Sequence, residues 1–163
     1  MKVVGIDPGT AHCGYGIVHG SGGRLRAIAH GWWQTRADER LELRLKRIYE
    51  GVAGLIAEHA PDAVVLEESF VGADARIALS VGQARGAVLV AAANAGVACA
   101  EYAPARVKSA VCGYGRADKH QVQRMVKMIL ALPEAPKPNH AADALAVAIC
   151  HALASPLLKV VSA

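Results

Sequence analysis

Acidic side chains stand at the ends of two short apolar runs in this sequence. The run KVVGI at 2–6 is followed by Asp7, and the run at 63–66 is followed by Glu67 and Glu68. An ionised carboxylate at a strand end inside a domain is costly to bury without a partner. Each acid also has an ordinary interpretation. Asp7 could cap the turn that follows it, and one of the two glutamates must point outward because adjacent strand residues alternate faces.

His140 and Asp143 form a second pair, three residues apart on one face of a predicted helix. Asp143 shares a stripe with Val147 and Cys150, which should face the core. It could also simply favour the start of the helix through the helix dipole. Several carboxylates that converge on one point repel one another, and some become protonated unless a cation holds them. Hard oxygen ligands of this kind suit Mg²⁺ or Mn²⁺.

Phosphoryl transfer is the chemistry that such a cluster supports. Two metal ions about 3.5–4 Å apart stabilise both the attacking and the leaving oxygen of an in-line displacement. Residues 1–80 carry nine Lys and Arg against ten Asp and Glu, whereas residues 81–163 carry nine against four. The basic stretch from Arg106 to Lys127 favours a polyanionic partner, with a solvated helix face as the alternative. A nucleic-acid phosphodiester is therefore the predicted substrate.

The periodicity of the chain predicts an α/β fold that would position these residues. Strands are expected at 2–6, 14–20, 24–35, 63–66 and 97–102, with a hairpin turn at 20–23. Helices are expected at 38–59, 75–93, 119–131 and from Asn139 onward, and a loop is expected at 104–117. Three strands in meander before alternating helices and strands predict a mixed sheet, antiparallel at first and parallel later.

Local signals refine two of the predicted helices. Asp38 is a plausible N-cap for the first. Gly82 and Gly86 lie inside the second, where each glycine costs about 1 kcal/mol relative to alanine. Two such residues suggest that another backbone approaches this helix closely, from a neighbouring element or from a second subunit.

Length and composition favour one folded domain over residues 1–163. The longest uncharged run, from Gly86 to Ala100, is shorter than the ~20 apolar residues that a membrane span needs, so no membrane association is expected. The four cysteines form no C-x-x-C pair, which argues against a zinc site or a disulfide framework and favours a reducing cytoplasm.

Six motifs in order along the chain closely resemble the RuvC family of bacterial Holliday-junction resolvases. They are GIDPGT with GYG at 5–16, EESF at 67–70, GQARG at 82–86, VK at 107–108, DKHQVQ-x-MV at 118–126 and HAADALAVAI at 140–149. The resemblance implies an RNase H-like fold, with a mixed five-stranded sheet and helices on both faces. It also implies an endodeoxyribonuclease that resolves four-way DNA junctions by paired symmetric nicks during recombination and repair, leaving 5′-phosphate ends.

The resemblance further implies a homodimer, Mg²⁺ or Mn²⁺ as cofactor with two ions per active site, and a branch-migration motor of RuvA and RuvB as partner. Carried over position by position, it assigns catalysis and metal binding to Asp7, Glu67, His140 and Asp143. The DNA-binding residues assigned in the same way are Phe70, Arg76, Lys108 and Lys119. Phe70 could stack on an unpaired base or simply belong to the core.

His140 departs from the family pattern, since many members have Asp at this position. A neutral imidazole can bind Mn²⁺ or carry protons near neutral pH. Because it adds no negative charge, we expect a relative preference for Mn²⁺ compared with a site made only of carboxylates. The alternative is that His140 faces solvent and that Asp143 alone provides the ligand from this helix.

Two other functions compete with the nuclease. A nucleotide-binding ATPase of the actin/sugar-kinase type also begins with a G-I-D-x-G-T motif, but it needs two such domains and a second phosphate hairpin. A junction-binding protein without cleavage activity on the same fold is the second alternative. The 163 residues leave no room for the two domains of the first alternative and contain no second G-T hairpin. The complete set of ligand positions argues against the second alternative.

Overall fold

The computed structural model describes residues 1–68 and 74–161. Along the chain, its elements are β1 (Lys2–Asp7), β2 (His12–Ser21), β3 (Arg24–Gln34), α1 (Leu41–His59), β4 (Ala63–Glu67), α2 (Ala75–Asn94), β5 (Ala98–Tyr102), α3 (Pro104–Cys112), α4 (Lys119–Ile129) and α5 (Asn139–Val161). Phe70 lies outside the described residues.

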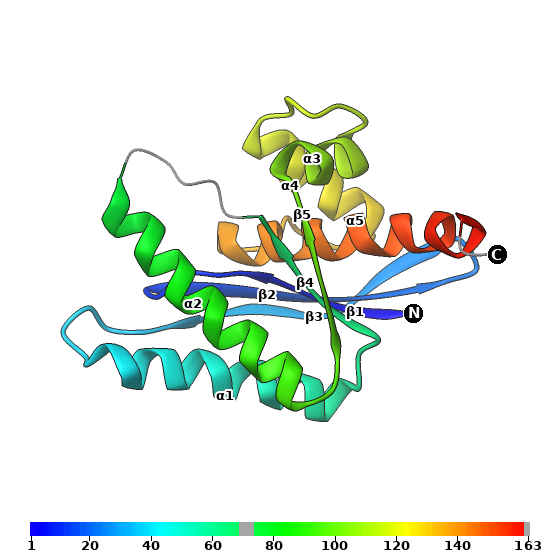
Figure 1. Ribbon diagram of the computed structural model, residues 1–163. Coiled ribbons are helices and arrows are strands. Elements are labelled where there is room, and N and C mark those ends of the chain that lie inside the picture. Colours follow the sequence, from blue (N-terminus) through cyan, green and yellow to red (C-terminus); the bar gives the residue numbers. More distant parts are fainter. Residues whose placement is uncertain (69–73, 162–163) are drawn as a thin grey trace.

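The strands form one five-stranded sheet in the order β3-β2-β1-β4-β5 (Figure 1). β1 and β2 are antiparallel, as are β2 and β3, whereas β4 is parallel to both β1 and β5. The expected mixed sheet is therefore confirmed. The hairpin turn between β2 and β3 is also confirmed, because Gly22 and Gly23 both have the positive φ that a tight hairpin requires.

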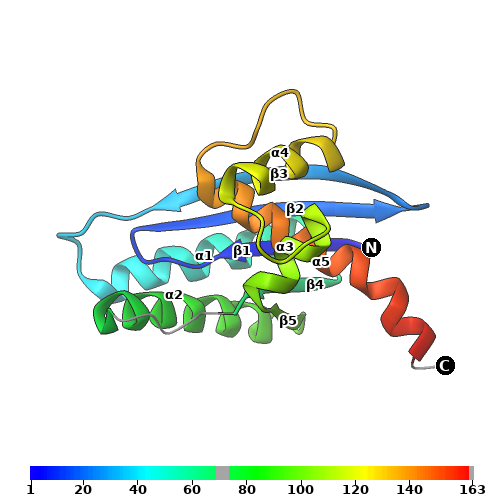
Figure 2. The same cartoon turned by 90° about the horizontal axis from the view of Figure 1, so that it is seen from above.

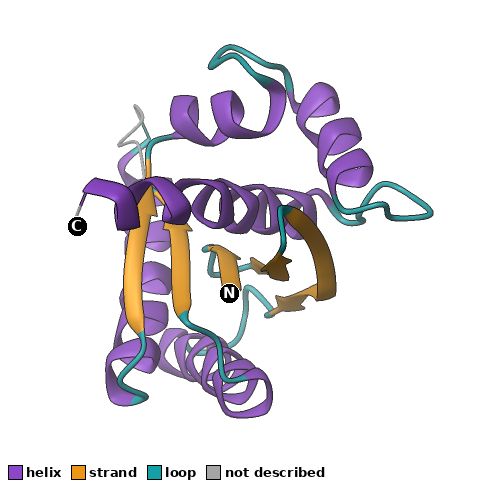
Figure 3. Cartoon of the chain, turned by 90° about the vertical axis from the view of Figure 1, so that its right-hand side faces the viewer, coloured by secondary structure: helices purple, strands orange, loops and turns teal. Residues whose placement is uncertain are grey.

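Helices cover both faces of the sheet (Figure 3). α1 and α2 pack against one face, over a core that includes Val4, Ile6, Ile48 and Val88. α5 crosses the other face and is itself flanked by α3 and α4 (Figures 1 and 2). Strand residues alternate between the two cores, which is why β1 and β4 read as continuous apolar runs.

α5 lies directly on the backbone of β1 and β2. A Cβ at Gly5 would lie 2.0 Å from the carbonyl oxygen of Ala144, and a Cβ at Gly14 would lie 2.1 Å from the carbonyl oxygen of His140. Both positions must therefore lack a side chain for the helix to approach this closely. The glycines of the GID and GYG motifs thus bring the first turns of α5 against the end of β1 that carries Asp7.

Two local predictions are wrong. The stretch 104–117 is not a loop, because it contains α3, which begins at Pro104 and ends before Gly113 at φ 87°. A proline in the first turn and a glycine after the last turn are ordinary helix boundaries. The Gly-Tyr-Gly sequence that follows this helix is also typical of a loop, which is why the helix was not predicted. Asp38 is not the N-cap of α1: the helix begins three residues later, and the Asp38 carboxylate pairs with Arg36.

The glycines of α2 have no close neighbour within the described chain, since a Cβ at Gly82 or Gly86 would meet no atom within 4 Å. The outer face of this helix, which carries the two glycines, also carries the exposed apolar side chains of Leu79 and Val90, and Ile77 is exposed in the first turn. By length and composition alone, α2 is the one described helix that could cross a membrane, a test that core helices of soluble proteins also pass.

Candidate active site

Asp7 and Glu67 are the last residues of two neighbouring parallel strands. Ile6 of β1 pairs with Leu66 of β4, so the two carboxylates follow directly at the same edge of the sheet. Both side chains are half-buried. Glu68 is exposed, and its backbone N–H donates to the carbonyl oxygen of Tyr102. The two glutamates therefore differ as the alternation of a strand requires.

The first turns of α5 bring His140 and Asp143 to the same place. His140 Nδ1 lies 2.7 Å from Asp7 Oδ2, so the imidazole N–H donates a hydrogen bond to the carboxylate. The other neighbour of the imidazole is His12 of β2, whose ring stacks on it at a centroid distance of 5.4 Å. His140 thus faces the acidic cluster and not solvent alone. His12 is a contact that the sequence analysis missed, because it depends on the pairing of β2 with the sheet.

The carboxylates act on one another electrostatically. Burial, followed by the charges of the nearby Asp143 and Asp7 carboxylates, raises the pKa of Glu67 to about 7, against a lowering effect from Lys108 and Lys119. Burial, together with the charge of Asp143, also raises the pKa of Asp7, although the hydrogen bond from His140 opposes the shift. Because these carboxylates are harder to ionise than usual, a cation bound among them would stabilise their ionised form.

The donor set fits a hard divalent cation. Asp7, Glu67 and Asp143 supply carboxylate oxygens and His140 supplies a ring nitrogen. The side chains are arranged in pairs: Asp7 with His140, and Asp143 with Lys119. Within residues 1–68 and 74–161, no three His, Cys, Asp or Glu side chains are gathered closely enough to surround one ion.

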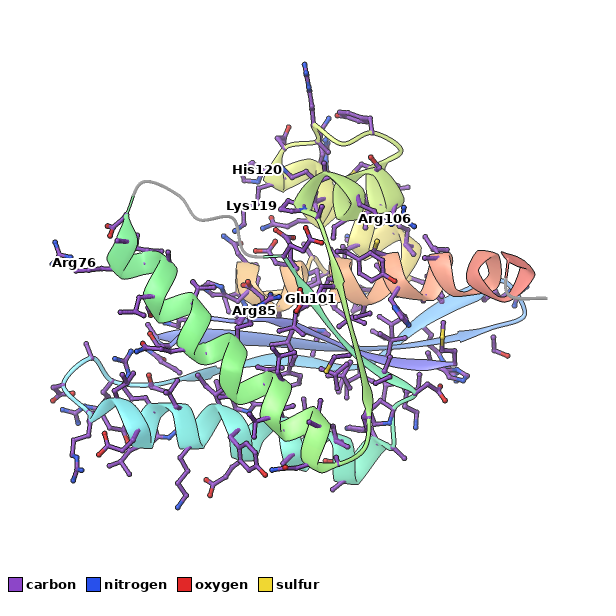
Figure 4. The ribbon with its side chains drawn as sticks, in the orientation of Figure 1. Arg76, Arg85, Glu101, Arg106, Lys119 and His120 are labelled. Carbon is purple, nitrogen blue, oxygen red and sulfur yellow. The ribbon has the colours of Figure 1, made fainter. Side chains whose placement is uncertain are left out.

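Basic side chains approach the cluster from α3 and α4. Lys119 Nζ lies 3.1 Å from Asp143 Oδ2 (Figure 4). Lys119 is the first residue of α4, where Asp118 and Gln121 form a capping box that fixes the start of the helix. Lys108 of α3 is half-buried and acts electrostatically on Glu67. Arg76, in contrast, is exposed at the start of α2 and points outward, away from this cluster (Figure 4).

Arg85 of α2 is a further residue of the site that the sequence analysis did not single out. Its Nη1 donates to the backbone carbonyl oxygen of Glu67 at 3.2 Å, and its Nη2 pairs with the Glu101 carboxylate of β5 (Figure 4). Because Arg85 is largely buried, both contacts fix the end of β4 relative to α2 and β5. The GQARG motif was the signal that could have identified it.

Comparison with known proteins shows the family to which the chain is similar. Residues 3–151 match the family model described as "Crossover junction endodeoxyribonuclease RuvC". The chain is 51% identical over 152 residues to the protein of that name from Desulforamulus reducens, covering 93% of each chain. It is 49% identical over 154 residues to the one from Natranaerobius thermophilus, covering 94% of this chain and 96% of the relative.

Solved structures give the same result. The structure of Thermus thermophilus RuvC in complex with a Holliday junction substrate has a TM-score of 0.93 and 42% identity, covering 98% of this chain and 97% of that chain. The yeast mitochondrial Holliday junction resolvase Ydc2 has a TM-score of 0.71 at 12% identity, a likeness of fold alone. The expected RNase H-like fold is therefore confirmed.

The raised pKa of Glu67 predicts a pH-dependent stability of the protein in a chelating buffer. The folded protein keeps a proton on Glu67 up to pH ~7, whereas the unfolded chain loses it near the ordinary value of 4.5. The free energy of unfolding should therefore fall as the pH rises between these two values. Glu67→Gln cannot ionise and should lack this decline, so thermal melting should find it stabilised relative to wild type at pH 8 but not at pH 4.5.

The matched control is Glu68→Gln, since Glu68 is the exposed neighbour of Glu67. Its melting temperature should differ from that of wild type by an amount that does not change with pH across this range. A Glu67→Gln profile parallel to that of wild type would contradict the burial and charge effects assigned to this side chain.

Proposed function

Since this chain belongs to the RuvC family of crossover junction endodeoxyribonucleases, we propose that Asp7, Glu67, His140 and Asp143 form the site at which it cleaves a four-way DNA junction. The enzyme acts on Holliday junctions in DNA recombination and repair, and the family is metal-dependent. The observation that carries the assignment of the site is the convergence of three carboxylates from β1, β4 and α5, with the pKa of both strand-end acids raised.

The four side chains have two roles in the proposed site: the three carboxylates would bind the metal, and His140 orients Asp7. Asp7 and Glu67 present oxygens from the rigid end of the sheet, and Asp143 presents one from the helix above them. His140 holds the Asp7 carboxylate in one orientation through Nδ1. Bound Mg²⁺ or Mn²⁺, as two ions, would supply the activated water and the charge that stabilises the phosphate. His140 in place of a fourth carboxylate favours Mn²⁺ relative to Mg²⁺, since it adds no charge.

The basic side chains hold the substrate. Lys119 and Lys108 stand beside the carboxylates and are placed to contact the phosphate that is cut or its neighbour. The pairing of Lys119 with Asp143 would be exchanged for a contact with the DNA backbone. Arg76 is farther out at the start of α2, where it suits contact with a more distant part of the junction. We assign Phe70 to stacking at the junction centre on family resemblance alone.

Two copies of the chain would cut two strands. The apolar outer face of α2 and its two glycines suit a second subunit, because a twofold pair of sites accounts for paired nicks. We further propose that the chain acts as a single nuclease domain in the cytoplasm and cooperates there with a RuvA and RuvB motor. The length and composition of the chain support the single domain, the use of its cysteines supports the cytoplasm, and the family resemblance supports the motor.

Cleavage of a labelled mobile four-way junction tests the proposed function. Wild type should place symmetric nicks on the junction but not on a linear duplex of the same sequence. Asp7→Asn should reduce the cleavage rate at least ~1,000-fold while junction binding is retained. The substitution replaces a charged carboxylate that would bind the metal with a neutral amide. Parallel reactions with Mg²⁺ and Mn²⁺, and with His140→Asp, measure the metal preference.

Tight binding without cleavage in either metal would indicate a junction-binding protein without nuclease activity. Cleavage by Asp7→Asn at the wild-type rate would remove Asp7 from the site. A ratio of Mn²⁺ to Mg²⁺ rates that His140→Asp leaves unchanged would contradict the role given to the imidazole.

Substitution on the outer face of α2 tests the dimer. Gly82→Leu would add a side chain where the described chain leaves open space, so the monomer should fold normally while a partner surface is blocked. Light scattering should therefore give a dimer for wild type and a monomer for Gly82→Leu. Gly54→Leu, at an equally open position on α1, is the control and should remain dimeric. A dimeric Gly82→Leu would exclude this face.

A further inference from the structure

A shallow hollow of about 490 Å³ lies directly beside the acidic cluster. It is lined by Trp32 from β3 and by Lys137, Pro138, Asn139 and His140, where the chain enters α5. The segment between α4 and α5 runs beside β3 at this place (Figure 2). Because His140 lines the hollow and also contacts Asp7, the hollow adjoins the proposed active site.

The pairing of β2 with β3 fixes Trp32 beside the start of α5. Trp32 is the register partner of Gly14, and the backbone of His140 occupies the space above Gly14. The indole therefore stands next to the first turn of the helix. It is 44% exposed, although its neighbour Trp33 is packed on Tyr15. Within the described part of the chain, no other aromatic ring stacks on Trp32.

A cation completes this surface. Lys137 is exposed and forms no ion pair with any described residue. Pro138 is only partly exposed and adds a rigid apolar wall. An aromatic ring with an adjacent free ammonium group is the combination by which proteins hold single-stranded nucleic acid, because the ring stacks on a base while the cation pairs with the backbone.

We propose that Trp32, Pro138 and Lys137 form a DNA subsite that holds the nucleotide next to the phosphate being cut. In this subsite the base or sugar of that nucleotide lies against the Trp32 ring, and Lys137 pairs with the adjoining phosphate. The inference rests on the proposed function, because the reacting phosphate must lie at the acidic cluster. It adds a group of positioning residues to which no role has been assigned.

DNA fits this surface better than a second copy of the chain does. The apolar area here is one indole and a proline, whereas a stable dimer interface needs about 800 Å² from each partner. The exposed face of α2 is the broader apolar surface. The charge of Lys137 and the shared residue His140 both indicate a polyanion that passes through the active site.

Cleavage at increasing enzyme concentration, in single turnover, tests the subsite. Trp32→Ala should raise the enzyme concentration that gives the half-maximal rate about tenfold. This change lies within the range of affinity that is lost when stacking on one base is removed. Trp32→Phe should restore most of the affinity because it keeps a stacking surface. Ile28→Ala is the matched control, since Ile28 is 41% exposed on the same strand but outside the hollow. A Trp32→Ala protein that behaves like Ile28→Ala would overturn the proposal.

Salt dependence gives an independent test on a side chain that folding does not require. Lys137→Gln should weaken junction binding. It should also lower the slope of log Kd against log salt by the amount that corresponds to the loss of about one phosphate contact. An unchanged slope would remove Lys137 from the subsite.

Tryptophan fluorescence reports the contact on a protein whose Trp32 is intact. Asp7→Asn protein titrated with junction should show quenching that the Asp7→Asn/Trp32→Phe protein lacks. Equal quenching in both would overturn the proposal, as would a change of oligomeric state in Trp32→Ala. If wild type does not cleave at all, the proposed function fails. If wild type cleaves and the Trp32 variants match the Ile28 control, only the subsite fails.

Discussion

The close approach of α5 to the backbone of β1 and β2 is the constraint on which the rest of the site depends. Gly5 and Gly14 leave no room for a Cβ beneath the helix, so its first turns lie directly on the sheet. This contact sets the height of His140 and Asp143 above Asp7, and it also places Trp32 beside the helix start. A side chain at either glycine would lift the helix and move His140 and Asp143 away from Asp7.

The same contact brings carboxylates close enough to repel one another, and basic side chains from neighbouring helices partly compensate for this repulsion. In this half-buried setting the charge of Asp143 raises the pKa of both Asp7 and Glu67, and the charge of Asp7 also raises the pKa of Glu67. Lys119 and Lys108 approach from α4 and α3, and Arg85 holds the backbone carbonyl oxygen of Glu67. The net result is a cluster whose ionised form gains from cations and whose rim carries cations that suit DNA phosphates. The acidic cluster that would bind the metal and the basic side chains that would bind the DNA are therefore directly adjacent.

Local patterns in the sequence were enough to predict the strands, the long helices and the acids at strand ends. Parallel strands end at the same edge of a sheet, so Asp7 and Glu67 could be placed together before any contact was known. α3 was missed because its Gly-Tyr-Gly exit resembles a loop. The hydrogen bond from Arg85 to Glu67, the His12–His140 stack and the position of Trp32 could not be predicted. Each depends on register or packing between elements far apart in the chain, which a single sequence does not encode locally.

Direct measurement of Mn²⁺ binding tests the central claim that the cluster of Asp7, Glu67, His140 and Asp143 binds divalent cations. Free Mn²⁺ can be followed by electron paramagnetic resonance during titration of the protein at pH 8. Wild type should bind Mn²⁺ at least tenfold more tightly than Asp7→Asn or Glu67→Gln, while Glu68→Gln, at the exposed neighbouring acid, should bind as wild type does. Equal Mn²⁺ affinity in all four proteins would contradict the account, because the ion would then be held elsewhere.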